Sequence, residues 1–243
     1  MVLPSLLAAL VLPAHAEDPT LDELLRNTDD VTRGASSIAT MEMHVRTARY
    51  ERNMRMKVWA QGEERTLIRI EAPAKDAGIS TLKVDDSIWN YLPKVDRTMK
   101  VPAGMMSGNW MGSHFSNDDL VKESRLSEDF DGAITGRPGD DPDGVYTVEL
   151  TPKADAAIVW GRIELTIRAD RLPLEIRYLD EDMELVRTMS FSDYQELDGR
   201  QVPTQMTLVP ADEPDEFTRM TYVELDFDVD IPESTFTLQA LKN

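Results

Sequence analysis

The side chains most able to do chemistry in this sequence gather between positions 113 and 119. Ser113 and His114 are adjacent, Ser116 follows, and Asp118 and Asp119 come next. A serine hydrolase needs a histidine base hydrogen-bonded to its serine, and an acid that orients the histidine. Neighbours in sequence do not provide that contact, and no G-x-S-x-G elbow occurs. A hydrolase therefore remains only an alternative, and it requires Ser113 or Ser116 to contact His114.

Metal and cofactor chemistry has little support. His15 lies in an N-terminal apolar run and His44 on the polar side of an expected strand. Neither of these, nor His114, has a partner at metal-ligand spacing. The acidic run at 140–144 lacks the length and the distal glutamate of an EF-hand loop, so we interpret it as a solvated turn. We expect no catalytic residue, no cofactor and no metal.

The acids at 118 and 119 also have a structural explanation. Ser116 or Asn117 fits the N-cap of a short helix, and Asp118 and Asp119 would occupy its first turn. Hydroxyl caps and acids in the first turn both favour a helix N-terminus. We therefore expect Ser116, Asp118 and Asp119 to cap the element that follows the preceding loop.

That preceding loop, residues 103–115, is unusual because it is both apolar and rich in glycine. It is too rich in glycine for a stable helix interior and too apolar for an ordinary solvated loop. It must therefore lie on an apolar surface, either plugging the interior or covering something bound there. If it moves as a lid, its apolar residues face a cavity and its glycines act as hinges. The apolar residues are Met105, Met106, Trp110, Met111 and Phe115, and the glycines are Gly104, Gly108 and Gly112.

The elements around this loop are mostly strands. Thr20 and Glu23 form a capping-box pattern, which predicts one amphipathic helix that ends near Gly34. From Ile38 onward apolar and polar residues alternate with a period of two, and turn residues separate the segments. We expect one domain of ten or more antiparallel strands with one apolar and one charged face, curled into a sandwich, barrel or half-barrel.

Methionines recur on the apolar face of these strands, and the chain contains 13 of them. A methionine-rich core would explain the pattern. Methionine is also flexible and polarisable, which suits a surface that re-packs around variable apolar partners. We therefore predict an apolar cavity lined by strand methionines: Met41, Met43, Met54, Met56, Met99, Met189, Met206 and Met220.

Composition limits the location and the partners. The first sixteen residues, ending in Ala14-His15-Ala16, are typical of a cleaved signal peptide, so we expect the chain from residue 17 in the periplasm. Cysteine is absent, which excludes a disulfide framework and a thiolate metal site. Asp and Glu outnumber Lys and Arg by 45 to 26, for a net charge of −19. That charge disfavours nucleic acid and limits contact with anionic membranes to transient encounters.

The order of motifs resembles the LolA-like outer-membrane lipoprotein-sorting family over about residues 21–241. The most specific part is Met111 to Leu120; the motifs Trp89-Asn-Tyr-Leu-Pro93, Phe191-Ser-Asp-Tyr194 and Ser234-Thr-Phe236 agree. His114 stands where the family pattern usually has Asp. Histidine titrates near neutrality, so a tether of the loop at this position would depend on pH.

The resemblance implies one domain, residues 17–243, of the mainly β (α+β) class: a strongly curved antiparallel sheet that forms an unclosed β-barrel or half-barrel. Its concave face would be covered by the N-terminal helix and the central loop. The implied function is a periplasmic carrier that binds acyl chains of a lipid or lipoprotein and passes them towards the outer membrane, with an RND-type exporter as a partner. The alternative is a non-enzymatic scaffold in which the loop plugs a dry core.

Overall fold

The computed structural model describes residues 18–242, apart from 123–125, 140, 142, 155 and 157. The expected signal peptide at 1–16 lies outside the described residues and stays a prediction. The acidic run at 140–144 is described only in part. Within the described part, no helix combines the length and the apolar character needed to cross a bilayer.

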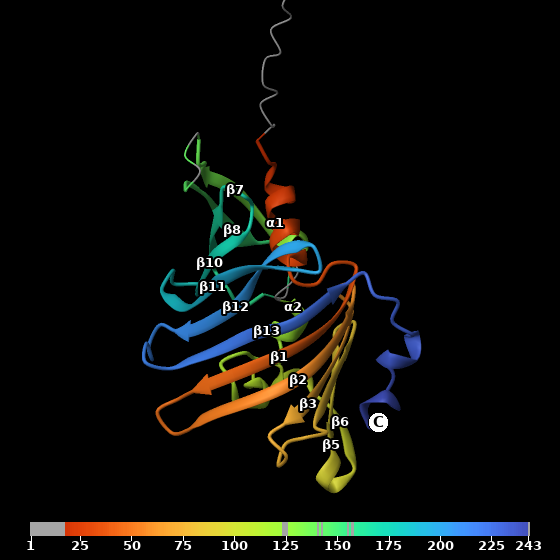
Figure 1. The fold of residues 1–243 in the computed structure, drawn as a ribbon. Helices are drawn as coiled ribbons and strands as arrows, with labels where there is room; N and C mark the ends of the chain where they lie inside the picture. The colour runs from red at the N-terminus through yellow and green to blue at the C-terminus, as the bar shows by residue number, and fades with distance from the viewer. Residues whose placement is uncertain are drawn as a thin grey trace, which may run out of the picture.

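One antiparallel sheet dominates the fold, and the described residues contribute thirteen strands to it (Figure 1). The predicted fold class, a curved sheet that does not close, is confirmed. The strands run in the spatial order β6-β5-β4-β3-β2-β1-β13-β12-β11-β10-β9-β8-β7, so β6 and β7 form its two edges. The strands are β1 (Ser36–Arg46), β2 (Glu51–Gln61), β3 (Arg65–Ala72), β4 (Ser80–Val84), β5 (Ser87–Leu92), β6 (Arg97–Lys100), β7 (Phe130–Gly136), β8 (Val145–Pro152), β9 (Arg162–Arg168), β10 (Pro173–Leu179), β11 (Leu185–Leu197), β12 (Arg200–Pro210) and β13 (Phe217–Phe227).

The two halves of the sheet join where the first strand pairs with the last. Each half is a meander whose strands pair with their neighbours in sequence, because short turns connect antiparallel strands. β1 and β13 then pair over their whole lengths, from Ser37 opposite Phe227 to Arg46 opposite Phe217. The described residues between the two meanders, 101–122 and 126–129, lie in the hollow of the curved sheet (Figure 1). We call them the crossing segment.

The helices follow the capping signals of the sequence. Helix α1 (Leu21–Asp30) begins at Thr20, whose hydroxyl accepts the Glu23 backbone N–H while the Glu23 carboxylate accepts the Thr20 N–H. The predicted capping box is thus confirmed. Two short helices, α2 (Asp119–Lys122) and α3 (Leu126–Asp129), lie in the crossing segment, and α1 packs on α3 and β7. Single-turn 3-10 segments are η1 (Pro93–Val95), η2 (Ala103–Met105), η3 (Trp110–Gly112), η4 (Glu233–Phe236) and η5 (Ala240–Lys242).

A row of four methionines crosses the centre of the sheet. Met54 pairs with Met43, Met43 with Met220 and Met220 with Met206, so the row runs through β2, β1, β13 and β12. Met43, Met54 and Met220 are buried, and each such side chain contributes about 1.5–3 kcal/mol by leaving water. This row lies on the face of the sheet that carries the main hydrophobic core.

The opposite face of the sheet is not simply solvated, which corrects the expectation of one charged face. The C-terminal segment turns back across β3, β4 and β5, and Ile231, Phe236 and Leu241 bury a second core there. Leu67 and Leu82 belong to this second core. Figure 1 shows the C-terminal segment beside these strands, away from the loop that fills the hollow. Strands β3 and β4 are therefore covered on both faces.

Candidate functional site

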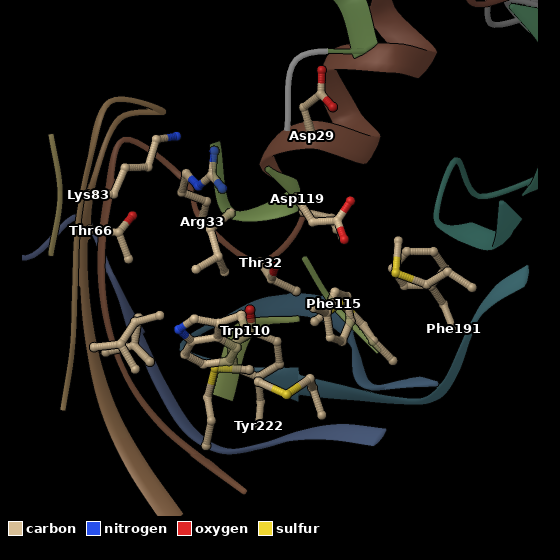
Figure 2. Close-up of a pocket in the computed structure, with 18 of the residues that line it drawn as sticks. Asp29, Thr32, Arg33, Thr66, Lys83, Trp110, Phe115, Asp119, Phe191 and Tyr222 are labelled. Carbon is tan, nitrogen blue, oxygen red and sulfur yellow. The ribbon is translucent and has the colours of Figure 1, made fainter. Parts of the chain in front are cut away.

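A cavity of about 210 Å³ lies between the concave face of the sheet, α1 and the crossing segment (Figure 2). A single water molecule needs only about 10–15 Å³ on the same measure, so the space is far larger than a packing defect. Most of its lining is apolar. The lining residues are Thr28, Asp29, Val31, Thr32, Arg33, Met41, Met56, Val58, Thr66, Ile68, Thr81, Lys83, Trp110, Phe115, Asp119, Leu120, Leu126, Ile176, Met189, Phe191, Met206, Met220 and Tyr222.

The apolar part of this lining is formed by Trp110 and Phe115 with the surrounding methionines. We call this part the floor. Both aromatic rings are buried, and both come from the loop 103–115. The Trp110 backbone N–H donates to the Phe115 carbonyl at 2.7 Å, which closes the loop on itself. The Trp110 indole N–H donates to the Thr81 hydroxyl at 3.1 Å, which fixes the ring against β4. The loop thus presents two rings to the cavity from a defined position.

Further hydrogen bonds tie this loop to the β1–β2 hairpin and to itself. The Tyr50 hydroxyl donates to the Gly112 carbonyl, and Arg52 donates to the Met111 carbonyl at 3.0 Å. The Asn117 side-chain amide donates to the carbonyls of Met105 and Gly108 at 3.2 and 2.9 Å. These bonds hold the loop over the concave face in the conformation described.

The predicted site residues divide into those that line the cavity and those that do not. Seven line it: Met41, Met56, Trp110, Phe115, Met189, Met206 and Met220. Met43 and Met54 are fully packed in the adjoining core, and Met111 packs against that core from the loop. These three side chains support the cavity wall and do not reach the cavity.

Three predicted lining residues lie elsewhere, and these expectations are wrong. Met99 is 36% exposed because it lies on the edge strand β6, where no further strand covers it. Met105 is 62% exposed, since the 3-10 turn η2 directs it outward while Asn117 holds its carbonyl. Met106 is half-buried but does not belong to the lining. The alternation and the apolar character of the loop did not distinguish covered from uncovered positions.

The three predicted hinge glycines differ in conformation. Gly112 has a φ of 72°, in the left-handed region that favours glycine, and Met111 beside it has a φ of 53°. A Cβ atom at Gly112 would lie 3.1 Å from the Tyr50 hydroxyl, so glycine also provides room there. Gly104 and Gly108 do not have a positive φ. Their role as hinges, like the movement of the loop, stays a prediction.

The predicted cap is built as a reciprocal pair. The Ser116 hydroxyl accepts the Asp119 backbone N–H at 3.1 Å, and the Asp119 carboxylate accepts the Ser116 N–H at 2.7 Å. Asp119 makes a second contact that the sequence did not indicate, because its partner is 68 residues away. Both Arg187 terminal nitrogens donate to its two oxygens at 2.7 Å, and both side chains are buried. Asp118 is half-buried, and its backbone N–H donates to the Met106 carbonyl at 2.8 Å.

Arg187 is further held by two aromatic rings. Its guanidinium carbon lies 4.7 Å from the ring centre of Trp160 and 4.3 Å from that of Tyr178. Stacking on ring faces and a fork of two hydrogen bonds suit arginine better than lysine. The crossing segment is therefore fastened to the C-terminal meander by a buried ion pair at Asp119, beside the cavity.

Opposite the floor, the cavity has a polar end that we call the mouth, formed by Asp29, Arg33, Thr66 and Lys83. Figure 2 shows Arg33 and Lys83 on one side of the cavity, with Trp110 and Tyr222 on the other. Asp29 accepts the backbone N–H groups of Leu126 and Ser127, each at 3.3 Å. Burial nevertheless raises the pKa of Asp29 to about 7, although these two N–H groups and the charge of Arg33 act to lower it.

The two cations of the mouth are held differently. The Lys83 ammonium group donates to the backbone carbonyl of Glu63. Arg33 lies in the turn between α1 and β1, where its backbone N–H donates to the Asp30 carbonyl at 3.1 Å. Its Nη1 atom is shielded from solvent and, among the described residues, has no hydrogen-bond partner. No sequence motif marks Arg33, Lys83 or Asp29, because three separate elements bring them together.

His114, where the sequence departs from the family pattern, belongs to the loop, and its side chain contacts β13 and the turn before it. Its Nδ1 is 2.8 Å from the Thr218 hydroxyl and its Nε2 is 3.1 Å from Glu216. This arrangement resembles a catalytic triad of a hydroxyl, a histidine and an acid. Thr218 is 0% exposed, however, so a substrate cannot reach its hydroxyl. The contacts that the hydrolase alternative required, from His114 to Ser113 or Ser116, are not formed among the described residues. The Ser113 hydroxyl donates to the Trp110 carbonyl instead.

Glu213 and Glu216 together offer His114 carboxylate partners that the sequence spacing did not reveal. One ligand atom from each of these three residues lies within 4.8 Å of the others. The Glu216 oxygens already accept the Ala48 backbone N–H and contact His114, and these two contacts lower the pKa of Glu216, the backbone N–H most strongly. His114 thus ties the loop to the β1–β2 and β12–β13 turns.

Comparisons with known proteins agree with this architecture. A family model described as "Uncharacterized protein" matches residues 62–243, more than half of the chain. No curated protein sequence matches the chain. Three crystal structures are similar over nearly their whole length. A DUF1329 family protein from Desulfovibrio piger has 24% identity and a TM-score of 0.80, with 90% of this chain and 97% of that chain covered.

The other two of these structures are a lipoprotein-sorting domain and a LolA superfamily protein. A putative outer membrane lipoprotein-sorting protein domain from Vibrio parahaemolyticus has 23% identity and a TM-score of 0.75, covering 91% of this chain and 98% of its own. A LolA superfamily protein from Nitrosomonas europaea has 18% identity and a TM-score of 0.75, covering 92% and 100%. At these identities the likeness establishes the fold. The chain therefore belongs to the family of the matching model, and its fold is that of the LolA-like outer-membrane lipoprotein-sorting proteins.

Proposed function

We propose that this protein is a carrier that holds an acyl chain of a lipid or lipoprotein in the cavity. The observation that carries this proposal is the cavity itself, about 210 Å³ lined mainly by apolar side chains. Cavities of this chemistry suit apolar ligands, because a polar ligand would lose its hydrogen bonds to water without replacement. The sorting proteins with the same fold support a lipid-like ligand.

The energetics suit a carrier. Burying one methylene group yields about 0.8 kcal/mol, so an acyl chain of ordinary length offers ample gross affinity. Five of the lining residues are methionines, whose flexible side chains adapt to chains of different shape. Release is then the step that needs a mechanism. Opening the loop 103–115 would expose the floor and lower the affinity, which would let a partner take the ligand.

The alternative, a scaffold with a plugged dry core, agrees with the many hydrogen bonds that hold the loop. It agrees less well with the space that the loop leaves unfilled. A plug that served only stability would be expected to pack to native density against the methionines, because each unfilled volume costs stability. The cavity between Trp110 and the strands therefore favours the carrier.

The route of transfer is part of the proposal. A signal peptide would place the chain in the periplasm, and the resemblance to sorting proteins suggests delivery towards the outer membrane. An RND-type inner-membrane exporter is the proposed partner. The net charge of −19 is consistent with short contacts with anionic membrane surfaces.

Quenching of Trp110 fluorescence tests the cavity as the binding place. In a variant with Trp59, Trp89 and Trp160 changed to Phe, Trp110 is the remaining tryptophan of the four. A lysophospholipid brominated on its acyl chain should quench this fluorescence in a saturable manner, because the chain would lie against the indole ring. The matched control keeps Trp59 alone, since Trp59 packs in the second core on the other face. The fluorescence of Trp59 in this control should not be quenched.

Blocking the cavity provides an independent check. Met206 is half-buried and lines the cavity, so Met206→Trp should fill part of the space with little effect on the packed core. Binding should weaken at least tenfold while the thermal midpoint changes by only a few degrees. Equal quenching of Trp59 and Trp110, or full binding by a folded Met206→Trp variant, would contradict the proposal. Lipid that co-purifies with the protein, identified by mass spectrometry, would support it.

A further inference from the structure

The mouth of the cavity contains a cation with one hydrogen-bond donor that no described residue satisfies. Arg33 lines the cavity, and its Nη1 atom is out of contact with solvent without a hydrogen-bond partner among the described residues. Leaving a charged donor buried and unbonded is costly, so such a group in a native structure requires an explanation. A ligand oxygen at this position would supply the missing acceptor.

The position of Arg33 relative to the floor defines what kind of ligand can do this. Trp110 in the apolar floor and Arg33 and Lys83 in the mouth line the same cavity (Figure 2). A chain lying on the floor would therefore place its polar end beside Arg33. Thr66 lies at the same end and adds a hydroxyl that can donate or accept.

Beyond the mouth the surface is strongly acidic. Lys83 also lines a neighbouring groove, whose other charged residues among those described are all acids: Asp30, Glu63, Glu64, Asp85, Asp86 and Glu128. This field disfavours a head group with additional negative charge, because like charges near a surface repel by about 1 kcal/mol or more at short range. The mouth therefore accommodates one negative charge close to the chain and opposes a second one further out.

We propose that the cavity binds an acyl amphiphile that carries a single anionic group, a phosphodiester or a carboxylate, and that Arg33 binds this group. The inference rests on the proposed carrier function and specifies its ligand. Arginine suits this role because its planar fork can donate two parallel hydrogen bonds to either kind of oxygen group.

Four ligands with the same palmitoyl chain test this specificity, measured with the variant that keeps Trp110 alone and below the concentration at which each ligand forms micelles. Monopalmitoylglycerol is neutral, palmitate carries a carboxylate, lysophosphatidylethanolamine carries one phosphodiester, and lysophosphatidic acid carries more than one negative charge. The ligands with one anionic group should bind about tenfold or more tighter than monopalmitoylglycerol, because a hydrogen bond to a charged group is made. Lysophosphatidic acid should bind more weakly than lysophosphatidylethanolamine.

The substitution Arg33→Gln should remove this advantage and leave monopalmitoylglycerol unchanged, and Arg33→Lys should restore part of it. The matched control is Arg26→Gln, since Arg26 is exposed on α1, the helix just before Arg33, and pairs only with the exposed Asp22 among the described residues. If Arg33→Gln weakens the binding of palmitate alone, the natural ligand carries a carboxylate. If it weakens the binding of lysophosphatidylethanolamine, the ligand carries a phosphodiester. Either result supports the proposal.

Two results separate the possible failures. If all four ligands bind equally, or if Arg33→Gln weakens all of them equally, the anionic-group proposal is overturned while the carrier function stands. If none of the four ligands binds to the folded protein, the carrier function itself is contradicted. Comparing the thermal midpoints of the Arg33 and Arg26 variants with that of the parent protein shows that each variant is folded.

Discussion

The floor and the mouth of the cavity are built on opposite principles. In the floor, the polar atoms of the loop are paired: the Trp110 indole N–H with Thr81, and the Gly112 carbonyl with Tyr50. In the mouth, Arg33 keeps a buried donor without a partner and Asp29 is buried with a raised pKa. Buried polar groups with hydrogen-bond partners stabilise a fold, whereas buried polar groups without partners are often retained for binding. This contrast fits the proposal that the floor holds the cavity in shape and that the mouth binds the polar end of a ligand.

Removing the anchor beside the floor should have the largest effect on stability. The substitution Asp119→Asn leaves the buried Arg187 guanidinium without its negative partner. Breaking a buried ion pair in this way costs about 3–5 kcal/mol. Urea denaturation should show a fall of that size in the free energy of unfolding.

The exposed pair of Arg168 and Asp170 is the control for this anchor, because it also has two hydrogen bonds between guanidinium and carboxylate but lies outside the core. Asp170→Asn should cost less than about 1 kcal/mol. Similar losses in the two variants would show that burial does not distinguish the anchor, and the assignment of the floor as the rigid part would fail.

Removing a charge from the mouth should raise the free energy of unfolding, whereas removing the Asp119 charge lowers it. The pKa of Asp29 is about 7 in the folded protein and 3.8 as its ordinary value. The folded state therefore holds a proton that the unfolded state has lost, so its stability falls as pH rises from about 4 to about 7. The penalty reaches about 4 kcal/mol above that range, at about 1.4 kcal/mol per pKa unit.

Asp29→Asn removes that penalty and keeps a carbonyl acceptor for one of the N–H groups of Leu126 and Ser127. The variant should be more stable than the parent protein at pH 8, by about 2 kcal/mol or more after the cost of one lost hydrogen bond. At pH 4 it should have no advantage. The neighbouring exposed acid provides the control, since Asp30→Asn should leave the pH dependence unchanged. An Asp29→Asn variant that is less stable at pH 8 would refute the raised pKa.

The sequence predicted the sheet, the first helix and much of the floor, because these depend on local periodicity and capping. Met41, Met56, Trp110 and Phe115 could be assigned to one apolar face from strand alternation and loop composition alone. The prediction failed where cover depends on distant segments. Met99 alternates correctly but lies on the edge strand β6, where nothing covers it.

The mouth could not be predicted for a related reason. From polarity alone, the apolar Leu82 of β4 would be assigned to the inner, core face and the charged Lys83 to the solvated face. The C-terminal segment covers the outer face, so Leu82 is buried there while Thr81 and Lys83 line the cavity. The phase of alternation identifies the two faces of a strand but not which of them is the inner one. Arg187 could likewise not be predicted, because its role as an anchor depends on the contact with the distant Asp119.

A smaller effect is expected from the indole hydrogen bond of the floor. Trp110→Phe keeps an aromatic ring but leaves the Thr81 hydroxyl without the N–H donor at 3.1 Å. The loss of a neutral hydrogen bond and of some ring volume should lower the free energy of unfolding by about 1–2 kcal/mol. Trp89→Phe, on the opposite face of the sheet, is the control for ring size. A Trp110→Phe variant as stable as the parent protein would show that this bond does not fix the floor.

The smallest expected effect on stability decides whether the loop can act as a lid. Tyr50 is exposed, and Tyr50→Phe removes only its bond to the Gly112 carbonyl, at a cost of about 0.5–1 kcal/mol. The informative measurement is hydrogen exchange at the His114 amide, which donates to the Thr218 hydroxyl. If the loop opens as a unit, exchange there should rise several-fold while the Leu126 and Ser127 amides of the mouth stay protected. If all three amides exchange only through global unfolding, the loop is a plug, and release of a ligand would have to occur through the mouth.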